Sequence, residues 1–255
     1  MLLKNPALIN TRKFIVNKVR RDSVLWNVLH FLYSLGMPWI PNTSIAKILS
    51  FYSKNKKNIF FIEIGANDGI TSDLLRSYII RDRWSGILIE PIKHIFNRLK
   101  VNYHGYQNLI FENVAVADKE ESRLFYIPRK NGAETRASFS LDVILSDPRL
   151  NIKIEEDLIA ERVQCVTLEK LLEKHGIVKV DIILIDTEGS DYEIIKHINF
   201  NIIKPSLIIF ERNNLTFHDY KKCINYLVKN GYRLSKDGNN VLAIKGAHAN
   251  LFKNI

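Results

Sequence analysis

Two different patterns of apolar residues divide the chain near residue 59. Between residues 24 and 40, apolar residues return every three or four positions, a spacing that predicts an amphipathic helix. After residue 59, short runs of Ile, Leu, Val and Phe alternate with longer amphipathic stretches. Such runs are typical of parallel strands that are buried on both faces and connected by helices. The sequence therefore predicts an α/β domain preceded by an N-terminal helical segment.

The second pattern places the individual elements. The predicted strands cover residues 59–64, 86–90, 109–116, 180–185 and 206–211. The predicted helices cover residues 71–80, 92–103, 167–175, 190–198 and 216–229. The chain then closes with two further strands around the turn DGNN, which predicts a hairpin by spacing and turn chemistry. We expect an open, mostly parallel sheet with an antiparallel end.

Residues 119–165 interrupt this alternation. Residues 122–128 predict an edge strand and residues 154–161 a short helix, whereas the stretch between them has no clean period. Irregular insertions on the ligand side of such a sheet often build a lid or a substrate pocket. An ordinary surface excursion is the alternative interpretation.

Residues 24–40 form the one candidate for a membrane-crossing helix in the sequence. The stretch is interrupted by polar residues and by a proline, and it is shorter than the roughly 20 residues that a span needs. An amphipathic helix fits better, and it either packs on the domain or lies at a membrane interface. A second short helix is predicted from Thr43 or Ser44 to about Tyr52.

Positive charge is concentrated in the same region. The net charge is +10, and residues 1–60 carry ten Lys and Arg against one acid, Asp22. The rest of the chain is nearly neutral, with 27 basic and 26 acidic side chains. We therefore expect residues 1–57 to contact an anionic partner, such as a membrane surface.

Chain length and composition set the remaining limits. With 255 residues and 46% apolar side chains, the chain can form one substantial domain with an appendage. We divide it into a basic helical segment (1–55), a folded domain (56–247) and a C-terminal tail (248–255). Cys165 and Cys223 lack metal-ligand spacing, and no signal peptide is evident, so they predict free thiols in a reducing compartment. We expect a cytoplasmic protein that can associate peripherally with a membrane.

The first predicted strand ends in the motif EIGANDG. Ligands bind beyond the carboxyl ends of parallel strands, where Gly65 and Gly69 let the backbone turn tightly and approach a ligand. The motif departs from the dinucleotide pattern GxGxxG because Asn67 stands at the third position and Asp68 lies inside the turn. Carboxylates would repel a pyrophosphate. Glu63 and Asp68 instead suit a ligand that carries positive charge.

A further acid, Glu90, ends the second strand 21 residues after Gly69. At this place and distance an acid binds the two ribose hydroxyls of an adenosine ligand. An unphosphorylated adenosine with a cationic tail describes S-adenosylmethionine. The sequence therefore predicts this molecule as the cofactor.

These motifs, together with ILIEP, NVAVAD and DIILIDTEGSDYEII, resemble the FkbM-type methyltransferases, S-adenosylmethionine-dependent enzymes that mostly methylate oxygen. The resemblance runs from about Phe60 to Lys245, with order and spacing matched throughout, and does not cover residues 1–55. It implies a Rossmann-like class I methyltransferase fold, with a mostly parallel sheet of seven strands of which the last is antiparallel.

The resemblance also implies roles for individual residues. Glu90 would hold the ribose hydroxyls, and Asn113, Val114 and Ala115 would face the adenine. Asp186 is expected to border both the cofactor and the acceptor. The methionine and ribose parts would be lined by Glu63, Gly65, Asn67, Asp68 and Gly69.

Catalysis is expected from carboxylates at two further strand ends. Asp186 and Glu188 follow the fourth strand, and Glu211 ends the fifth, so they should meet at the rim that holds the cofactor. An aliphatic hydroxyl needs a positioned base, and clustered carboxylates raise one another's pKa. Asp186 and Glu188 are the first candidates for the base or for orienting the acceptor, and Glu211 is the third. His218, which lies outside any motif, is an alternative base.

Other expectations limit the reaction. Asp191 is expected to cap the next helix. The three acids could hold magnesium, but the resemblance requires no metal and we expect none. After the fourth strand stands DTEG rather than a DPPY-like tetrapeptide, and neither cysteine lies where a cytosine-methylating nucleophile would, so the sequence argues against a nucleic-acid substrate.

The sequence as a whole predicts an S-adenosylmethionine-dependent O-methyltransferase. Its acceptor would be a hydroxyl on a glycan, a glycolipid or a secondary metabolite. The alternative is a non-catalytic or membrane-surface-associated binding protein that retains the methyltransferase fold.

Overall fold

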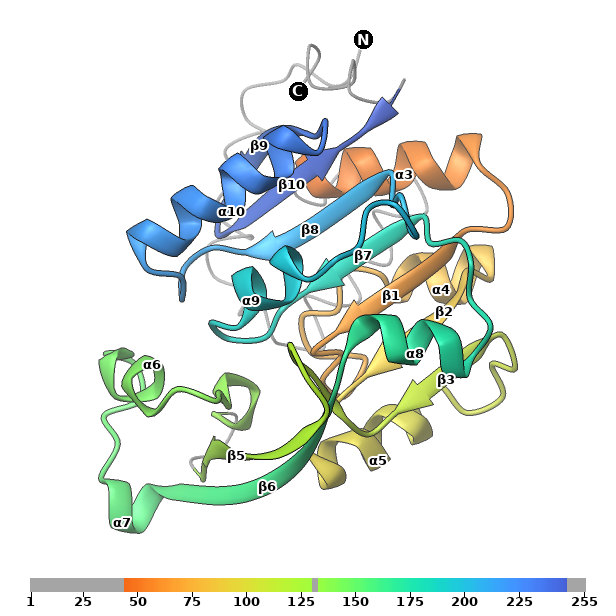
Figure 1. Cartoon of the computed structure of the whole chain (residues 1–255). Helices are drawn as coiled ribbons and strands as arrows, with labels where there is room; N and C mark the ends of the chain where they lie inside the picture. The colour runs from red at the N-terminus through yellow and green to blue at the C-terminus, as the bar shows by residue number, and fades with distance from the viewer. Residues whose placement is uncertain (1–43, 130–132, 247–255) are drawn as a thin grey trace, which may run out of the picture.

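The computed structural model describes residues 44–129 and 133–246 (Figure 1). The helix predicted over residues 24–40 and the predicted C-terminal tail, 248–255, lie outside these ranges. At the centre of the structure is a seven-stranded sheet in the order β3-β2-β1-β7-β8-β10-β9. The expected open sheet is therefore present.

The strands of this sheet follow the predicted positions closely. Only β10 runs antiparallel to its neighbours, and it forms the predicted hairpin with β9. The chain leaves β1 toward β2 and β3 and then returns to pair β7 on the other side of β1, which makes β1 and β7 the switch point of the sheet. The strands are β1 (Phe60–Ile64), β2 (Ser85–Ile89), β3 (Leu109–Glu112), β7 (Ile182–Ile185), β8 (Leu207–Glu211), β9 (Arg233–Asp237) and β10 (Asn240–Ile244).

Helices cover both faces of the sheet and form a three-layered domain (Figure 1). One face is covered by α3 (Ser44–Asn55), α4 (Arg76–Asp82) and α5 (Lys93–Asn102). The other is covered by α8 (Leu168–Lys174), α9 (Asp191–Lys196) and α10 (Phe217–Lys229). This arrangement explains why the parallel strands are mainly apolar, since both of their faces are buried.

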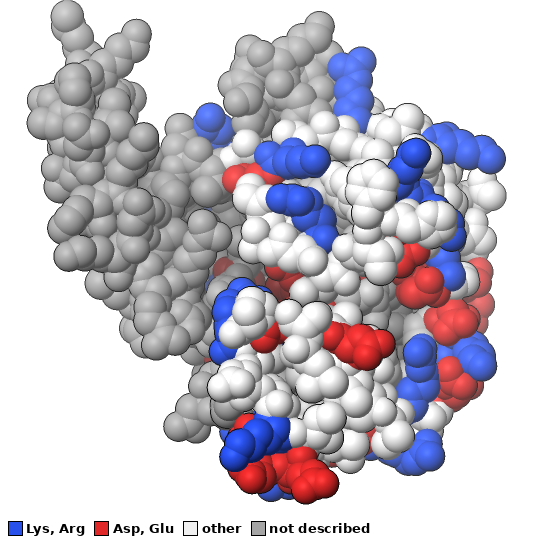
Figure 2. All heavy atoms as spheres, turned by 90° about the vertical axis from the view of Figure 1, so that its left-hand side faces the viewer, with Lys and Arg blue, Asp and Glu red and all other residues white. Residues whose placement is uncertain are grey.

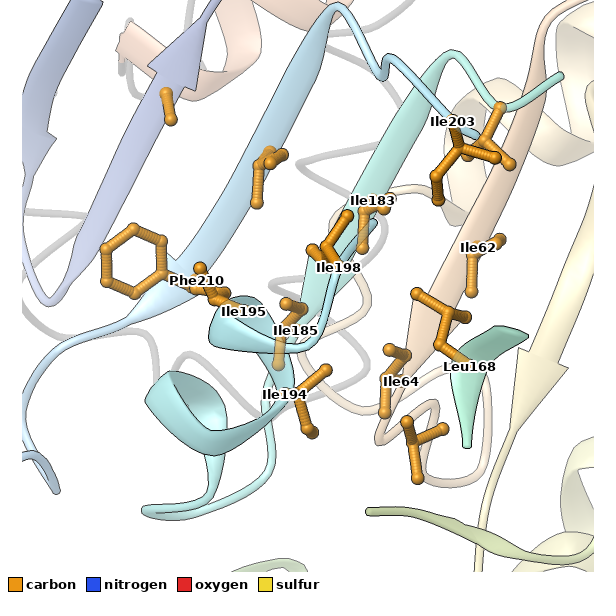
Figure 3. Packing of buried hydrophobic residues seen from close by; sticks show 14 of the residues in the cluster. Ile62, Ile64, Leu168, Ile183, Ile185, Ile194, Ile195, Ile198, Ile203 and Phe210 are labelled. Carbon is orange, nitrogen blue, oxygen red and sulfur yellow. The ribbon is translucent and has the colours of Figure 1, made fainter. Parts of the chain in front are cut away.

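Side chains of β1 alternate between the two layers of helices. Ile62 and Ile64 pack with Leu168 of α8 and Ile194 of α9, as Figure 3 shows. Phe61 packs on the opposite side, in the core that contains residues of α3, α4 and α5. Because alternate strand residues share a face, Glu63 points to the same side as Phe61, toward the layer of α3, α4 and α5.

Helix α3 is an integral part of the folded domain. Its buried residues, including Ile48, Leu49 and Tyr52, belong to the same core as the strands. Residues 44–55, which the sequence analysis places in the N-terminal segment, therefore pack as part of the domain. Within the ranges that the structure describes, no helix is long and apolar enough to cross a membrane.

The insertion forms a second, three-stranded sheet in the order β4-β6-β5. Residues 109–116, predicted as one strand, are divided between β3 and β4 (Ala115–Val116). The prediction of a helix over residues 154–161 is wrong beyond Asp157, because only α7 (Ile154–Asp157) is helical. Residues from Leu158 onward form β6 (Leu158–Val166), which pairs along its length with the predicted edge strand, β5 (Glu121–Pro128). Between them lie a short 3₁₀ turn, η2 (Glu134–Arg136), and α6 (Leu141–Ser146).

Charged side chains of both signs intermingle on the described part of the face shown in Figure 2. This distribution agrees with the nearly equal numbers of basic and acidic residues beyond residue 60. The described face therefore offers no broad surface of a single charge.

Candidate active site

A cavity of about 990 Å³ opens at the carboxyl ends of the central strands. Its walls include the residues that follow β1, β2, β7 and β8, together with part of the insertion and the turn between β9 and β10. This is the position at which open parallel sheets bind ligands. The insertion thus contributes to the cavity, as expected for a substrate pocket.

The loop after β1 brings backbone close to this cavity. Gly65 and Gly69 have φ values of +87° and +70°, a conformation that favours glycine. The N–H groups of Gly65 and Ala66 both donate to the carbonyl oxygen of Ile89, at 3.0 and 2.9 Å. The loop after β1 is therefore fixed against the end of β2.

Asp68 organises this loop through its own side chain. Its Oδ1 atom accepts hydrogen bonds from the N–H groups of Ile70 and Thr71, at 2.9 and 2.7 Å. Its Oδ2 atom accepts a third from the hydroxyl of Thr71, at 3.0 Å. Asp68 lines the cavity, but much of the hydrogen-bonding capacity of its carboxylate is satisfied within the loop.

A second acid, Asp73, delays the start of the following helix. Its Oδ1 atom accepts hydrogen bonds from the N–H groups of Leu75 and Arg76, at 2.7 and 2.8 Å. Side chains that bind nearby backbone N–H groups in this way compete with helix formation. The helix predicted over residues 71–80 therefore begins only at Arg76.

Glu63 lies at the cavity wall with its carboxylate almost completely buried. The residue is 3% exposed, and its Oε2 atom has no hydrogen-bond partner among the described residues. Burial raises the pKa of Glu63 well above its usual value, and the neighbouring carboxylates of Asp73 and Asp186 raise it further. A ligand cation placed here would satisfy this carboxylate.

Glu90 is held at the end of β2 by two backbone groups. Its Oε2 atom accepts from the N–H of Asn67 at 3.0 Å, and its Oε1 atom accepts from the N–H of Ile92 at 2.8 Å. A carboxylate oxygen can accept more than one hydrogen bond, so both atoms can also accept from ligand hydroxyls. Burial raises the pKa of Glu90 to about 7.

The three residues predicted to face the adenine differ in position. Val114 and Ala115 line the cavity. The side-chain amide of Asn113 instead donates to the carbonyl oxygens of Glu90 and Pro91, both at 2.9 Å, and Asn113 is not part of the cavity wall. Asn113 therefore holds the turn that presents Glu90.

The residues around the first two strand ends fit S-adenosylmethionine. The buried, unsatisfied oxygen of Glu63 suits a cationic group, and the carboxylate of Glu90 is positioned to accept hydroxyl groups. Gly65 also lines the cavity, in a backbone conformation that favours glycine. When bound, the cofactor would contribute its electrophilic methyl group to this cavity.

Three carboxylates meet on the other side of the same cavity. Asp186, Glu188 and Glu211 each offer an oxygen within 4.8 Å of the others, a spacing at which a metal ion could be held. Asp186 is open to the cavity, and the other two are half-buried. The structure thus brings together the three residues that the sequence proposed for catalysis.

The surroundings of these three carboxylates raise their pKa values to different degrees. Desolvation raises the pKa of Asp186 to about 6, although Arg136 opposes the shift. Desolvation, together with the charges of Asp186 and Glu211, raises the pKa of Glu188 to about 8. The pKa of Glu211 is raised to about 7, and desolvation is again the largest cause. Carboxylates with such values can accept a proton near neutral pH.

Side chains that sequence reasoning missed support this cluster. The amide of Asn214 donates to Glu188 at 2.5 Å and to Glu211 at 3.3 Å, so it joins the two carboxylates. The hydroxyl of Ser138, in the insertion, donates to the carbonyl oxygen of Glu188 at 2.8 Å. Asn214 lies only three positions after Glu211, a signal in the sequence that could have identified it.

Two arginines from the insertion also line the cavity. Arg136 and Arg149 both bind Asp147, at 3.0 and 2.7 Å. They place positive charge near the three carboxylates of this cluster. Neither arginine follows a recognisable motif, and only the fold of the insertion brings them to the site.

Two predictions from the sequence concern other residues. The prediction that Asp191 caps a helix is wrong, and the structure gives no support to His218 as a base. Asp191 is not a helix cap, because it is the first residue of α9 and Ser190 occupies the cap position. It is fully buried and accepts hydrogen bonds from the Thr187 hydroxyl at 2.9 Å and the Glu211 N–H at 3.1 Å. His218 is exposed on α10 and is not part of the cavity wall.

Comparisons with known proteins provide a family match. The family model described as Methyltransferase FkbM domain matches residues 63–234. A search of curated proteins finds no match.

Solved structures that are similar to this chain include two proteins named as methyltransferases and a fibrillarin. A precorrin-6y C5,15-methyltransferase from Geobacter metallireducens is 12% identical, with a TM-score of 0.43 and coverage of 79% of this chain and 87% of that chain. Fibrillarin from Aeropyrum pernix, with natively bound S-adenosyl-L-methionine, is 12% identical, with a TM-score of 0.41 and coverage of 74% and 67%. A human methyltransferase 10 domain-containing protein is 12% identical, with a TM-score of 0.43 and coverage of 85% and 81%. TM-scores this low do not identify a family. The family of this chain is therefore identified by the match to the family model.

Proposed function

The chain belongs to the FkbM methyltransferase family and uses S-adenosylmethionine, and on that premise we propose that it methylates a hydroxyl group. The acceptor would be a glycan, a glycolipid or a secondary metabolite. The observation that supports oxygen as the acceptor atom is the cluster of Asp186, Glu188 and Glu211 beside the cofactor pocket. An aliphatic hydroxyl is a poor nucleophile until a positioned base takes its proton.

Glu188 is the residue best suited to act as this base. Its raised pKa gives its carboxylate a greater proton affinity than that of an ordinary glutamate. Asn214 holds one of its oxygens by a hydrogen bond and leaves the carboxylate half-buried at the cavity wall. Asp186, which is open to the cavity, would then orient the acceptor hydroxyl.

The insertion completes the acceptor side of the cavity. Phe125 and Phe139 add apolar surface, and Arg136 provides a positive charge that offsets part of the negative charge of the carboxylates. A partly enclosed site of this kind excludes water and aligns the acceptor with the methyl group. The insertion would therefore determine which acceptors enter.

A second part of the proposal concerns where the enzyme acts. The N–H of Ile45, at the start of α3, donates to Asp237 Oδ2 at 2.8 Å, and both residues line the cavity. The basic segment that precedes residue 44 therefore joins the domain at the rim of the active site. This position supports an acceptor at an anionic membrane surface, to which such a segment would bind.

The experiment that tests the proposed reaction uses S-adenosylmethionine with a labelled methyl group. The full-length protein is incubated with a cell extract, and the label is then followed into glycan, lipid, small-molecule, protein and nucleic-acid fractions. We expect the label in one of the first three, in a methyl ether that resists alkaline hydrolysis. Label that enters only protein or nucleic acid, or no incorporation beyond that seen with Glu188→Gln, would contradict the proposal.

A further inference from the structure

Asp191 connects the ends of the two strands that carry the clustered carboxylates. It is the first residue of α9, and its side chain is fully buried. Its Oδ2 atom accepts a hydrogen bond from the Thr187 hydroxyl at 2.9 Å, and its Oδ1 atom accepts one from the Glu211 N–H at 3.1 Å. Thr187 follows β7, and Glu211 ends β8. One carboxylate therefore bridges the loop after β7 and the end of β8.

This bridge begins where the pairing of β7 with β8 stops. The last paired residues of the two strands are Ile185 and Phe210, one position before Glu211. Beyond that pair, the side chain of Asp191 is the acceptor for the Glu211 N–H. Ile194 of the same helix packs in the core cluster that contains Ile185 and Phe210 (Figure 3), so α9 is fixed against both strands. The relative position of the two strand ends therefore depends on α9 and its first residue.

The backbone of Glu188 adds a second reason to expect a precise arrangement here. Its φ is +50°, in the left-handed region that a residue with a side chain adopts only at a cost in free energy. This conformation is held from two sides. Asp191 binds the preceding residue, Thr187, and the Ser138 hydroxyl donates to the carbonyl oxygen of Glu188 at 2.8 Å. The strained loop brings an oxygen of Glu188 within 4.8 Å of one of Glu211.

We propose that Asp191 is a positioning residue for methyl transfer, which sets the separation of the clustered carboxylates by holding Thr187 and the backbone of Glu211. Thr187 stands between Asp186 and Glu188, so its position determines where both carboxylates project. A displacement of about 1 Å at reacting groups can slow a reaction about 100-fold. The inference rests on the proposed function of this cluster. Asp191 itself is not part of the cavity wall, so it acts through its neighbours.

Asp181 provides a matched control at the opposite edge of the sheet. It is 3% exposed, and its Oδ2 atom accepts a hydrogen bond from the Phe60 N–H at 2.9 Å. It precedes β7, whereas the cavity opens beyond the carboxyl end of that strand, and it is not part of the cavity wall. Asp181→Ala should therefore lower stability, as the loss of a buried acid with a backbone partner does, without changing methyl transfer by the folded protein.

The test compares variants that remove the two hydrogen bonds with variants that keep them. Asp191→Ala removes both. The amide that Asp191→Asn introduces can accept from the Glu211 N–H and donate to the Thr187 hydroxyl. Thr187→Val removes the hydroxyl with little change of shape, and Thr187→Ser keeps it. Each variant is used as the full-length protein, and thermal unfolding gives the fraction that is folded.

The first measurement is total transfer of labelled methyl from S-adenosylmethionine into a cell extract, per folded protein. Transfer should fall about 10- to 100-fold in Asp191→Ala and about 10-fold in Thr187→Val, and it should stay within about threefold of wild type in the two variants that keep the hydrogen bonds. Affinity for S-adenosylhomocysteine, measured by calorimetry, should stay within about threefold in every variant, because the bridge lies on the acceptor side. A loss of turnover without a loss of cofactor binding distinguishes positioning from general destabilisation.

The second measurement is hydrogen exchange by NMR, which tests the bridge without methyl transfer. The Glu211 amide should exchange about 5- to 10-fold faster in Asp191→Ala, relative to the other amides of β8, because it loses its acceptor. Asp191→Asn and Asp181→Ala should not produce this local change. Global destabilisation would instead accelerate exchange along the whole strand.

Several results would overturn the inference. Equal losses of transfer in Asp191→Ala and Asp181→Ala, at the same folded fraction, would show that Asp191 is only structural. Full activity of Thr187→Val, or a loss in Asp191→Asn as large as that in Asp191→Ala, would refute the hydrogen-bonded bridge.

Failure of the proposed function has a different signature. Label that enters only protein or nucleic acid would refute the proposed acceptor, but the comparison of variants would remain valid because it measures total transfer. If wild type transfers no methyl group, the proposed function fails. The exchange rate of Glu211 then decides the bridge by itself, and an unchanged rate in Asp191→Ala overturns it.

Discussion

The backbone carbonyl oxygen of Asp186 occupies the space that a Cβ atom on residue 65 would need. Gly65 follows β1 and Asp186 follows β7, so this contact joins the loop after β1 to the carboxylate cluster at the switch point of the sheet. The absence of a side chain at position 65 therefore fixes the distance between the two halves of the active site.

Replacement of Gly65 by alanine should destabilise the protein strongly. Gly105 provides a matched control, because its φ is also +87° and nothing lies within 4 Å of a Cβ built on it. Both variants introduce the same backbone strain, and only Gly65→Ala introduces a clash with backbone. We expect Gly65→Ala to lower the free energy of unfolding by about 1–3 kcal/mol more than Gly105→Ala. Urea unfolding measures this difference, and equal losses would contradict the steric explanation.

Glu90→Ala should weaken cofactor binding by ~1–3 kcal/mol, because hydrogen bonds to a charged group are lost. Glu112 is a suitable control: it is buried at the end of the neighbouring strand, but it binds Lys174 and His175 and lies outside the cavity wall. Glu112→Ala should change stability without changing cofactor affinity. Calorimetry that shows Glu90→Ala binding like wild type would refute the assignment to the ribose.

Glu188→Gln should lower turnover by ~10²–10⁴-fold, which is the usual contribution of a positioned base. Cofactor affinity should change little, because Glu188 lies with the carboxylates on the acceptor side. The loss should also depend on pH. Since the pKa of Glu188 is about 8 and the base must be ionised, wild-type turnover should rise with pH and level off above about 8.

The turnover of Glu188→Gln should not show this rise with pH. A comparison of single-turnover rates between pH 6 and 9 measures both effects. Asp186→Asn should also lower turnover, through loss of acceptor alignment. Full activity in both variants would transfer the role of base to Glu211, the third carboxylate of the cluster.

Asp191 should make the protein less stable as pH rises. Its pKa is raised from the usual 3.8 to about 8, mainly by burial. Between these values the folded state binds more protons than the unfolded state, so the free energy of unfolding falls with increasing pH. Asp191→Asn removes this effect. Between pH 5.5 and pH 8.5, its free energy of unfolding should therefore rise by about 1 kcal/mol or more relative to that of wild type.

Urea unfolding at the two pH values measures this gain. Glu193→Gln is the control, because Glu193 lies in the same helix with an exposed side chain. Its effect on stability should be the same at both pH values. A pH-independent difference between Asp191→Asn and wild type would show that Asp191 is ionised in the folded protein.

The full-length protein should co-sediment with anionic vesicles and be released as the salt concentration rises. Basic residues near an anionic surface contribute roughly 1 kcal/mol each, and salt screens the attraction. Reversing Arg20 and Arg21 to Glu should reduce binding, whereas reversing the exposed Lys221 and Lys222 of α10 should not. Equal effects of the two double variants, or no sedimentation of wild type, would contradict a role of the N-terminal segment at membranes.

The sequence alone determined the main sheet and predicted the edge at which its cavity opens. Apolar runs such as those of β1 and β7 predict buried parallel strands because both faces of each strand must be covered. The glycines after β1 and the acid after β2 then predict a cofactor pocket, since parallel strands place their carboxyl ends at one edge. Local patterns are sufficient for these features because each depends on residues that are close in sequence.

Tertiary structure decided the parts of the site that come from distant segments. The first residues of β6, 158–161, were predicted to be helical, but pairing with β5 makes them a strand, because strand formation depends on a partner. Arg136 reaches the carboxylates, and Tyr103 reaches Asp73, only through the packing of elements that lie far apart in the chain. The raised pKa values of Glu63 and Asp191 likewise arise from burial among other acids, which spacing along the sequence does not reveal.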